Sequence, residues 1–154
     1  MNSPIGRLRI VVDGDVVTYL AMEDQAHLPS VTTFGKKSKG CAAQAVAELD
    51  AYFAGELQCF RFATSAHGTL FQQAVWKALS NISFGQTSTY GAIAHAIGNP
   101  KAVRAVGSAI GHNPLSIVVP CHRVIGASGN LTGYAGGLDR KRFLLQLEGV
   151  SVAG

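Results

Sequence analysis

Residues 87–110 read TSTYGAIAHAIGNPKAVRAVGSAI, and this stretch predicts two short helices joined by a tight turn. Thr87 or Ser88 caps the first helix, because a hydroxyl side chain can accept from the unpaired N–H groups at a helix start. Gly98 ends that helix, and Asn99-Pro100 supplies an N-cap and a first-turn proline for the second. The pair is typical of a helix-turn-helix, although short helical hairpins also occur in proteins that never bind DNA.

The second of these helices, which we expect to end near Ile110, has two distinct faces. Residues three and four apart lie on the same side of a helix. The apolar residues that should pack inward are Val103, Val106 and Ile110. The polar residues on another face are Lys101, Arg104 and Ser108. Since the remaining positions are small, we interpret the polar face as a nucleic-acid contact; a solvated face with two ordinary charges is the alternative.

A further helix is predicted just before this pair. Thr69, with Gln72 three residues later, forms a capping box for a helix over residues 70–79. The apolar face of that helix consists of Phe71, Val75, Trp76 and Leu79. Together these helices predict a mostly helical domain over residues 67–154.

The first 66 residues have a mixed pattern. Two β-rich runs flank Asp13-Gly14-Asp15, which predicts a hairpin. Helical spacing over residues 42–53 ends at Gly55, and Leu57–Phe62 is predicted as a third strand. We therefore expect an α+β fold with a scaffold domain over residues 1–66.

The amino-acid composition limits the class of protein to which this chain can belong. The 154 residues are 47% hydrophobic and 14% charged, as in a globular chain with a core. No apolar run approaches the about 18 residues of a membrane span, and the first residues lack the pattern of a secretory signal. We expect a cytoplasmic protein (nuclear in a eukaryote) that is a monomer.

Charge is divided unevenly along the chain. Residues 1–66 carry six basic and seven acidic residues for a net charge of −1, and residues 67–154 carry seven basic and two acidic residues for +5. No acidic residue occurs between Glu56 and Asp139. Such a surface suits a polyanion, because each neutralised phosphate releases counterions. A mildly basic domain of no special purpose is the alternative.

One of the three cysteines lies in a chemically active setting. Cys41 and Cys59 have no disulfide or zinc-ligand spacing and are expected to be buried structural thiols, so no metal site is predicted. The segment Pro120-Cys121-His122-Arg123-Val124-Ile125 sets a thiol beside an imidazole and a guanidinium. Because the thiolate is the nucleophile and nearby positive charge favours it, Cys121 is the candidate nucleophile.

This hexapeptide resembles the active-site signature of the DNA alkyltransferases, the methylated-DNA–protein-cysteine methyltransferases. Other blocks similar to that family follow the family's order and cover residues 68–149: Thr89-Tyr90-Gly91, residues 99–107, Asn113-Pro114, residues 133–137 and Leu147-Glu148-Gly149. The resemblance implies a ribonuclease-H-like antiparallel sheet plus helix, followed by a winged-helix-like domain with a helix-turn-helix.

The resemblance also implies a reaction. An alkyl group passes from O6 of guanine in DNA, with O4 of thymine as a further candidate, to Cys121, once per molecule and without a cofactor. His122 is the implied proton acceptor, acting through a water, and Glu148 orients its imidazole. Asn113 is the implied brace of the backbone between the recognition helix and the active-site loop.

A substrate pocket is implied as well. Tyr134 would donate to the guanine oxygen, assisted by backbone N–H groups near Ala135 and Gly136. The other implied pocket residues are Ile110, Ser116 and Val124. Ser116 stands where some relatives have proline, which leaves acceptance of bulky benzyl-type groups open.

The partner implied is double-stranded DNA that contains alkylated guanine. Because O6 lies inside the stacked duplex, the nucleotide must rotate out into the pocket. Arg104 would fill the vacancy and Tyr90 would press on the neighbouring phosphate. Gly91, Asn99 and Ala127 match positions of close backbone or phosphate contact. The family places this helix in the minor groove, with little sequence preference.

Two other functions are open. A non-catalytic binder of alkylated DNA would share the helix-turn-helix, but such relatives replace the nucleophilic cysteine. A cysteine hydrolase could use Cys121 and His122, but it leaves the basic helix unexplained.

Overall fold

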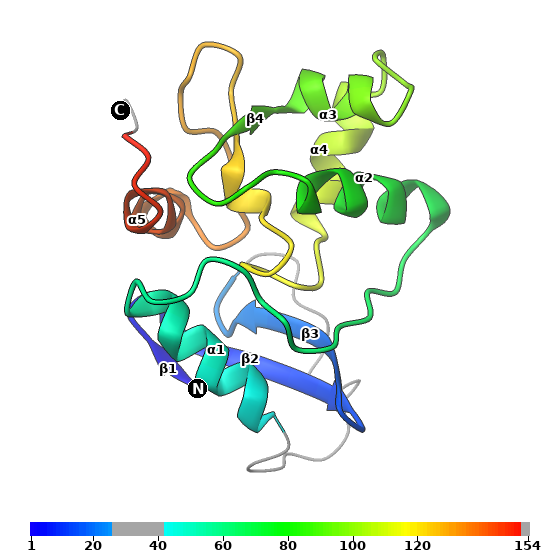
Figure 1. Cartoon of the computed structure of the whole chain (residues 1–154). Coiled ribbons are helices and arrows are strands. Elements are labelled where there is room, and N and C mark those ends of the chain that lie inside the picture. The colour runs from blue at the N-terminus through cyan, green and yellow to red at the C-terminus, as the bar shows by residue number, and fades with distance from the viewer. Residues whose placement is uncertain (26–41, 152–154) are drawn as a thin grey trace.

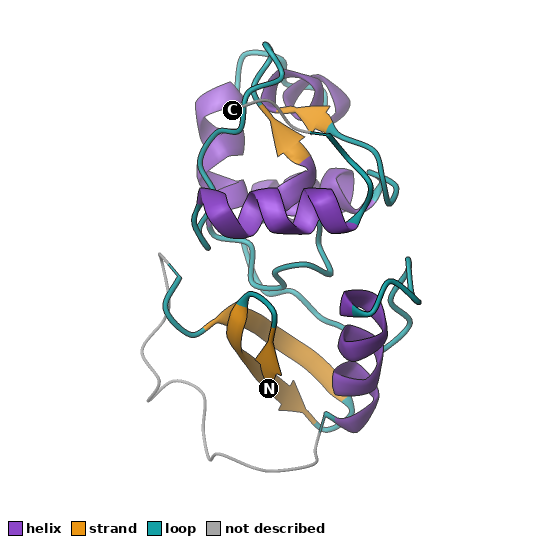
Figure 2. Ribbon diagram, turned by 90° about the vertical axis from the view of Figure 1, so that its left-hand side faces the viewer, coloured by secondary structure: helices purple, strands orange, loops and turns teal. Residues whose placement is uncertain are grey.

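The computed structural model describes residues 1–25 and 42–151. A three-stranded antiparallel sheet with one helix forms one part, and a group of helices forms the other (Figures 1 and 2). The α+β fold class predicted from the sequence is confirmed. In the described part of the chain, no helix is both long and apolar enough to cross a membrane.

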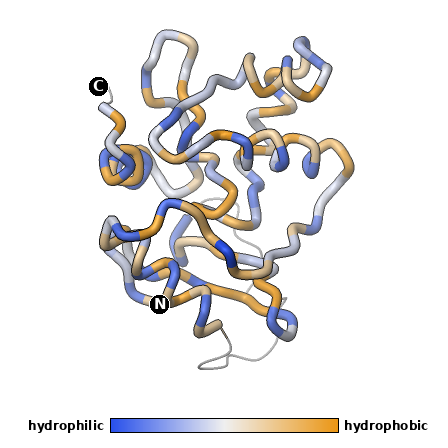
Figure 3. The backbone as a smooth tube through the Cα atoms, in the orientation of Figure 1, coloured by the Kyte–Doolittle hydropathy of each residue, from blue (hydrophilic) through white to orange (hydrophobic). Residues whose placement is uncertain are grey.

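The sheet is built around one hairpin. Its strands, in the order β1-β2-β3, are Asn2–Ser3, Gly6–Asp13 and Val16–Met22. The predicted hairpin is confirmed, because Asp13 pairs with Val16 across a two-residue turn in which Gly14 has a φ of 61°. Hydrophobic residues dominate β3, whereas β2 and α2 mix hydrophobic and hydrophilic residues (Figure 3). Helix α1 (Ala43–Phe53) lies beside this sheet and buries Leu49 and Tyr52.

The predicted third strand at Leu57–Phe62 is wrong, because β1 takes the third place in the sheet. The backbone N–H groups of Arg61 and Phe62 donate instead to Oε1 of Glu48 on α1, over 2.5 and 3.3 Å. This segment meets the sheet only afterwards, at a bridge between Val17 and Thr64. A helix side chain therefore satisfies the donors that a strand would have used.

The helix-turn-helix is confirmed. Helices α2, α3 and α4 span Leu70–Ser80, Tyr90–Ala96 and Val103–Gly111. Thr89, not Thr87 or Ser88, caps α3, because its side chain accepts from the N–H of Ala92 over 3.1 Å. Trp76 donates its indole N–H to the carbonyl of Ala109 over 2.9 Å and so fixes α2 against α4.

The start of α4 differs from the prediction. The N–H of Ala102 donates to the carbonyl of Asn99, which closes a turn over Asn99-Pro100 and delays the helix to Val103. Val103 is 41% exposed rather than packed inward, since it lies in the first turn of the helix. Val106 and Ile110 are buried as predicted.

The two parts of the chain are joined through β3. The N–H of Leu20 donates to the carbonyl of Pro114, and the N–H of Ser116 donates to the carbonyl of Leu20, over 2.8 and 2.9 Å. Beyond this bridge the chain forms a short 3-10 helix, η2, at Cys121–Arg123, and then β5 at Val124–Ile125. Strand β5 pairs in parallel with β4 (Ser88–Thr89), and α5 (Leu138–Leu147) follows.

The capping box at the start of α2 allows a stability prediction. Thr69 accepts from the N–H of Gln72 over 3.1 Å, and the Gln72 side chain accepts from the N–H of Thr69 over 3.0 Å. Thr69→Ala should lower the free energy of unfolding by about 1 kcal/mol, measured by urea denaturation. Thr87→Ala is the matched control, since that exposed threonine caps no helix. Equal losses in both variants would contradict the assigned cap.

Candidate active site

The site lies on the segment between α4 and β5. Ile117, buried at 1% exposure, has a φ of 74°, and no other non-glycine residue among those described has a positive φ. Strained backbone of this kind persists only where the surrounding structure holds it in place, and it is found most often at functional sites. Four residues later the chain reaches Cys121.

Cys121 opens η2 and is 5% exposed. Burial raises the pKa of its thiol above the ordinary value. The Asn113 side chain, the Lys141 ammonium and backbone N–H groups of residues 121 and 122 act in the opposite direction. The resting thiol is therefore neutral at neutral pH, and these neighbouring groups offset only part of the effect of burial.

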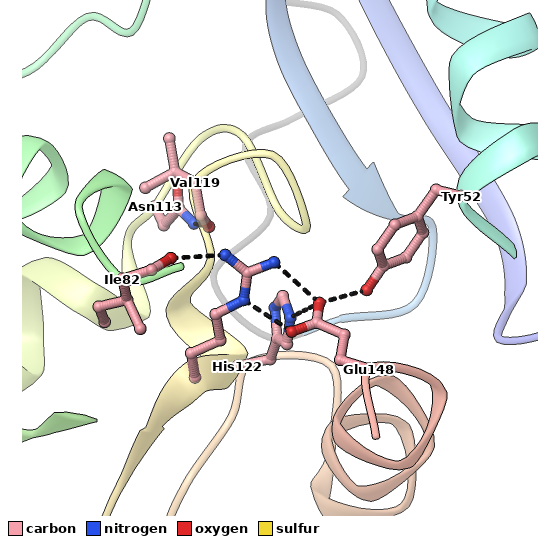
Figure 4. A network of polar contacts seen from close by, with 7 residues as sticks. Tyr52, Ile82, Asn113, Val119, His122 and Glu148 are labelled. Atoms are coloured by element: carbon pink, nitrogen blue, oxygen red, sulfur yellow. Dashed lines mark hydrogen bonds and ion pairs between the residues drawn. The ribbon is translucent and has the colours of Figure 1, made fainter. Parts of the chain in front are cut away.

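Glu148, the C-cap residue of α5, is the centre of a buried polar network (Figure 4). Its Oε1 accepts from Nε of Arg123 over 2.7 Å. Its Oε2 lies 2.7 Å from Nε2 of His122 and accepts from the second guanidinium nitrogen of Arg123 and from the Tyr52 hydroxyl over 3.0 and 2.6 Å. Burial alone would raise the pKa of Glu148, but the hydrogen bonds from these neighbours outweigh it and lower the pKa to about 2.

The network fixes the hydrogen positions on His122. An ionised carboxylate can only accept, so Nε2 of His122 carries the hydrogen that points at Glu148. Burial lowers the pKa of His122, although Glu148 opposes this, and the imidazole is neutral at rest. Its Nδ1 is then a bare acceptor, and the structure gives it no hydrogen-bond partner.

The second buried polar atom without a partner, within the described residues, is the Tyr134 hydroxyl. Burial raises the pKa of Tyr134 well above the ordinary value, and the charge of a nearby Cys121 anion raises it further. Tyr134 is therefore a neutral donor. Since buried polar groups are almost always paired, an unpaired acceptor on the residue next to Cys121 and an unpaired donor that interacts electrostatically with Cys121 indicate a place for substrate.

Asn113 lies where it can brace the segment that leads to Cys121. Its amide nitrogen donates to the carbonyl of Val119 over 2.8 Å, and its amide oxygen accepts from the N–H of Leu115 over 2.9 Å. The side chain thus spans the backbone between α4 and η2.

Residues from both parts of the chain contact the loop that carries Tyr134. A Cβ on Gly136 would come within 2.2 Å of the Met22 side chain from β3, so only glycine fits there without a shift. Ala135 and Gly136 are half-buried. The buried Lys141 ammonium donates to the carbonyl of Thr132 over 2.9 Å, and burial lowers the pKa of Lys141 to about 8.

The remaining predicted pocket residues are buried. Ile110 lies at the end of α4 and Val124 in β5. Ser116 directs its hydroxyl toward the Oε1 of Gln25 over 3.4 Å, which connects it to the end of the N-terminal sheet.

The predicted DNA-contacting residues lie at the surface. Gly91, Asn99, Arg104 and Ala127 are exposed. Tyr90 is half-buried at the first position of α3, and its hydroxyl accepts from the Thr132 hydroxyl over 3.0 Å. The start of α3 therefore adjoins the loop that carries Tyr134.

Two expectations about the cysteines and their neighbours are wrong. Cys59 is exposed rather than buried, because the segment that carries it forms a loop outside the sheet; Cys41 lies outside the described residues. Arg123 does not serve the thiol as the nearby cation, since it is paired with Glu148 and donates to the carbonyl of Ile82 over 2.6 Å. Lys141 is the cation that acts on Cys121. No group of three potential metal ligands occurs within the described ranges.

Sequence reasoning missed Tyr52, Gln25 and Lys141. Tyr52 reads as one apolar position of an amphipathic helix, and Lys141 reads as a surface residue beside Arg140 and Arg142. Only the fold brings Tyr52 to a residue 96 positions away. Nothing in the local pattern distinguishes the buried lysine from its half-buried neighbours.

Comparison with known proteins finds two models of one family that together match nearly the whole chain. Residues 1–66 match the family model described as 6-O-methylguanine DNA methyltransferase, ribonuclease-like domain, and residues 70–150 match the DNA binding domain of the same family. The chain is 55% identical to the methylated-DNA–protein-cysteine methyltransferase of Mycobacterium tuberculosis, covering 96% of this chain and 89% of that protein. The protein of the same name from Haemophilus influenzae is 46% identical, with 95% and 82% covered.

The fold agrees as closely. A crystal structure of the Mycobacterium tuberculosis protein in complex with DNA superposes with a TM-score of 0.91 at 54% identity, covering 96% of this chain and 89% of that one. Identity at this level over nearly the full length leaves no competing assignment. The chain belongs to the 6-O-methylguanine DNA methyltransferase family.

Proposed function

We propose that this protein repairs DNA by direct reversal of damage. It transfers a methyl or other alkyl group from O6 of guanine in double-stranded DNA to Cys121 in one irreversible turnover. Family membership supports the reaction. The observation that carries the assignment of residues is the pair of buried atoms without partners: Nδ1 of His122, the residue next to Cys121 in the chain, and the Tyr134 hydroxyl, which interacts electrostatically with Cys121.

Each partner group has one task in the reaction. The thiol proton passes to Nδ1 of His122, through a water, and Glu148 stabilises the imidazolium that forms. The sulfur then bonds to the alkyl carbon as the carbon–oxygen bond breaks. The electron pair of that bond stays on the guanine oxygen, which accepts a hydrogen bond from Tyr134 as charge develops, and the proton held by the His122 imidazolium then passes to the departing guanine. A thioether is a very poor leaving group, so the product does not revert.

The measurement that tests this function is methyl transfer counted per protein molecule. A duplex with one O6-methylguanine is incubated in excess with the protein, and the intact protein is weighed over time. We expect a plateau at one methyl group for each molecule. DNA binding without a mass gain would instead favour the non-catalytic binder, and repeated turnover on an ester would favour a hydrolase.

We propose that Arg104 enters the base stack when the damaged nucleotide rotates out. The exposed place of Arg104 on the polar face of α4 supports this. Arg104→Ala should slow transfer from duplex DNA by about tenfold or more, because unstacking costs a few kcal/mol. Transfer from the free base O6-methylguanine should be unchanged. Lys77→Ala, which removes an exposed charge from α2, is the control; equal losses on both substrates would refute the assignment.

The remaining expectations are carried forward as proposals. Tyr90, Gly91, Asn99 and Ala127 contact the DNA backbone, and α4 lies in the minor groove. The protein acts as a cytoplasmic monomer (nuclear in a eukaryote). The chain divides into domains 1–66 and 67–154, although the contacts of Leu20 with residues 114–116 couple the two closely.

A further inference from the structure

The N-terminal part of the chain reaches the candidate active site through Tyr52. This residue lies in the last turn of α1 and is 1% exposed. Its ring packs against Phe53 and Phe60, with centroids 5.3 Å away in both cases, and against Phe84 at 6.4 Å. A ring enclosed on several sides has little freedom, so its hydroxyl is held in one place.

The hydroxyl donates to the oxygen of Glu148 that His122 also contacts. Tyr52 lies 2.6 Å from Oε2 of Glu148, and Nε2 of His122 lies 2.7 Å from the same atom. Figure 4 shows Tyr52 approaching Glu148 from α1, opposite the segment that carries Asn113. The hydroxyl and the imidazole therefore compete for the negative charge of one oxygen.

We infer that Tyr52 is a positioning residue for alkyl transfer: by donating to Oε2 of Glu148, it fixes the carboxylate and keeps His122 neutral, with Nδ1 free to accept a proton. This inference rests on the proposed function. Through Tyr52, the N-terminal part of the chain contributes to the alkyl transfer at Cys121.

The balance of charges around His122 explains why one hydroxyl matters. Glu148 on α5 favours the imidazolium, whereas Arg123 on η2 and Lys141 on α5 oppose it, as does burial. Cys121 and Tyr134 are neutral at rest. Tyr52 on α1 removes part of the negative charge that Glu148 presents to the imidazole. Without the hydroxyl, Glu148 would hold the imidazolium more strongly, and a protonated His122 cannot accept from the thiol.

The test is the pH profile of single-turnover methyl transfer by full-length Tyr52→Phe, from a duplex with one O6-methylguanine. In the unsubstituted protein the rate should be level through neutral pH and fall only when His122 becomes protonated in acid. In Tyr52→Phe this acid limb should move up by about one pH unit, because a hydrogen bond to a charged group has about that effect. The rate should thus fall up to about tenfold on the acid side and stay close to that of the unsubstituted protein above about pH 8.

Phe60→Leu is the matched control. It removes one ring contact with Tyr52 but keeps the hydroxyl and the contacts with Phe53 and Phe84 that hold the ring, so it should lower the melting temperature and leave the pH profile unchanged. A second variant with 3-fluorotyrosine at position 52 keeps the hydroxyl as a stronger donor, and its acid limb should move down. That variant decides the matter if Tyr52→Phe does not fold.

These measurements distinguish a failure of the proposed function from a failure of the inference about Tyr52. If the unsubstituted protein accepts no methyl group, the proposed function fails. If it accepts one, the inference fails when Tyr52→Phe has an unchanged profile or loses rate equally at every pH. It also fails when the fluorinated variant shows no downward shift.

Discussion

Cys121→Ala abolishes methyl transfer and leaves the affinity for duplex DNA nearly unchanged. The sulfur is the only atom of the site that bonds to the transferred carbon in the proposed reaction, and alanine offers no replacement. The predicted DNA contacts are on α3, α4 and the turn after β5, so removal of a thiol that is 5% exposed should not disturb them. Single-turnover transfer and a binding titration with the same duplex measure the two properties separately.

Cys59→Ala is the matched control for this prediction, because Cys59 is an exposed thiol. It should transfer at the rate of the unsubstituted protein. Residual single-turnover transfer by Cys121→Ala would show that another thiol accepts the methyl group.

The second large effect is expected from Glu148→Gln. The substitution leaves the buried Arg123 guanidinium without a counter-charge, and breaking a buried ion pair costs about 3–5 kcal/mol. That loss is a large share of the about 5–15 kcal/mol that stabilises an ordinary domain. Urea denaturation at neutral pH measures it. The exposed Glu56→Gln is the control and should change stability by less than about 0.5 kcal/mol.

The same carboxylate predicts how stability depends on pH. Its pKa is lowered from 4.5 to about 2 in the folded protein. A group of this kind stabilises the fold fully above its unfolded pKa and loses that contribution as the pH falls toward its folded pKa. The unsubstituted protein should therefore lose about 3 kcal/mol between about pH 5 and pH 2. Glu148→Gln should lack this part of the acid dependence, and identical acid transitions in both proteins would contradict the assigned network.

Local sequence signals predicted the elements that local chemistry determines. The capping box at Thr69 and the hairpin around Gly14 are confirmed, because each depends on residues within one turn. The start of α4 was predicted at Asn99-Pro100, yet a turn closed by the N–H of Ala102 uses those residues. A proline after an asparagine fits both a turn and a helix start, so the sequence alone does not choose between them.

Residues of the site could be predicted only where they belong to a sequence motif. His122 and Glu148 are 26 residues apart, and their contact was expected from the resemblance rather than from any spacing rule. Arg123 was expected to act on the thiol as a neighbour in sequence, but its side chain turns to Glu148. Tyr52 and Lys141 could not be found at all, since their importance depends on which buried group the fold sets against them.

The central claim is that Cys121 accepts the alkyl group, and the most direct measurement is peptide mapping by mass spectrometry. The protein is exposed to a duplex with one O6-methylguanine and digested, and the peptides that contain Cys41, Cys59 and Cys121 are each weighed. We predict one added methyl group on the Cys121 peptide and none on the other two. A methyl group on either of the others, or an unmodified Cys121 after complete loss of the lesion, would contradict the account.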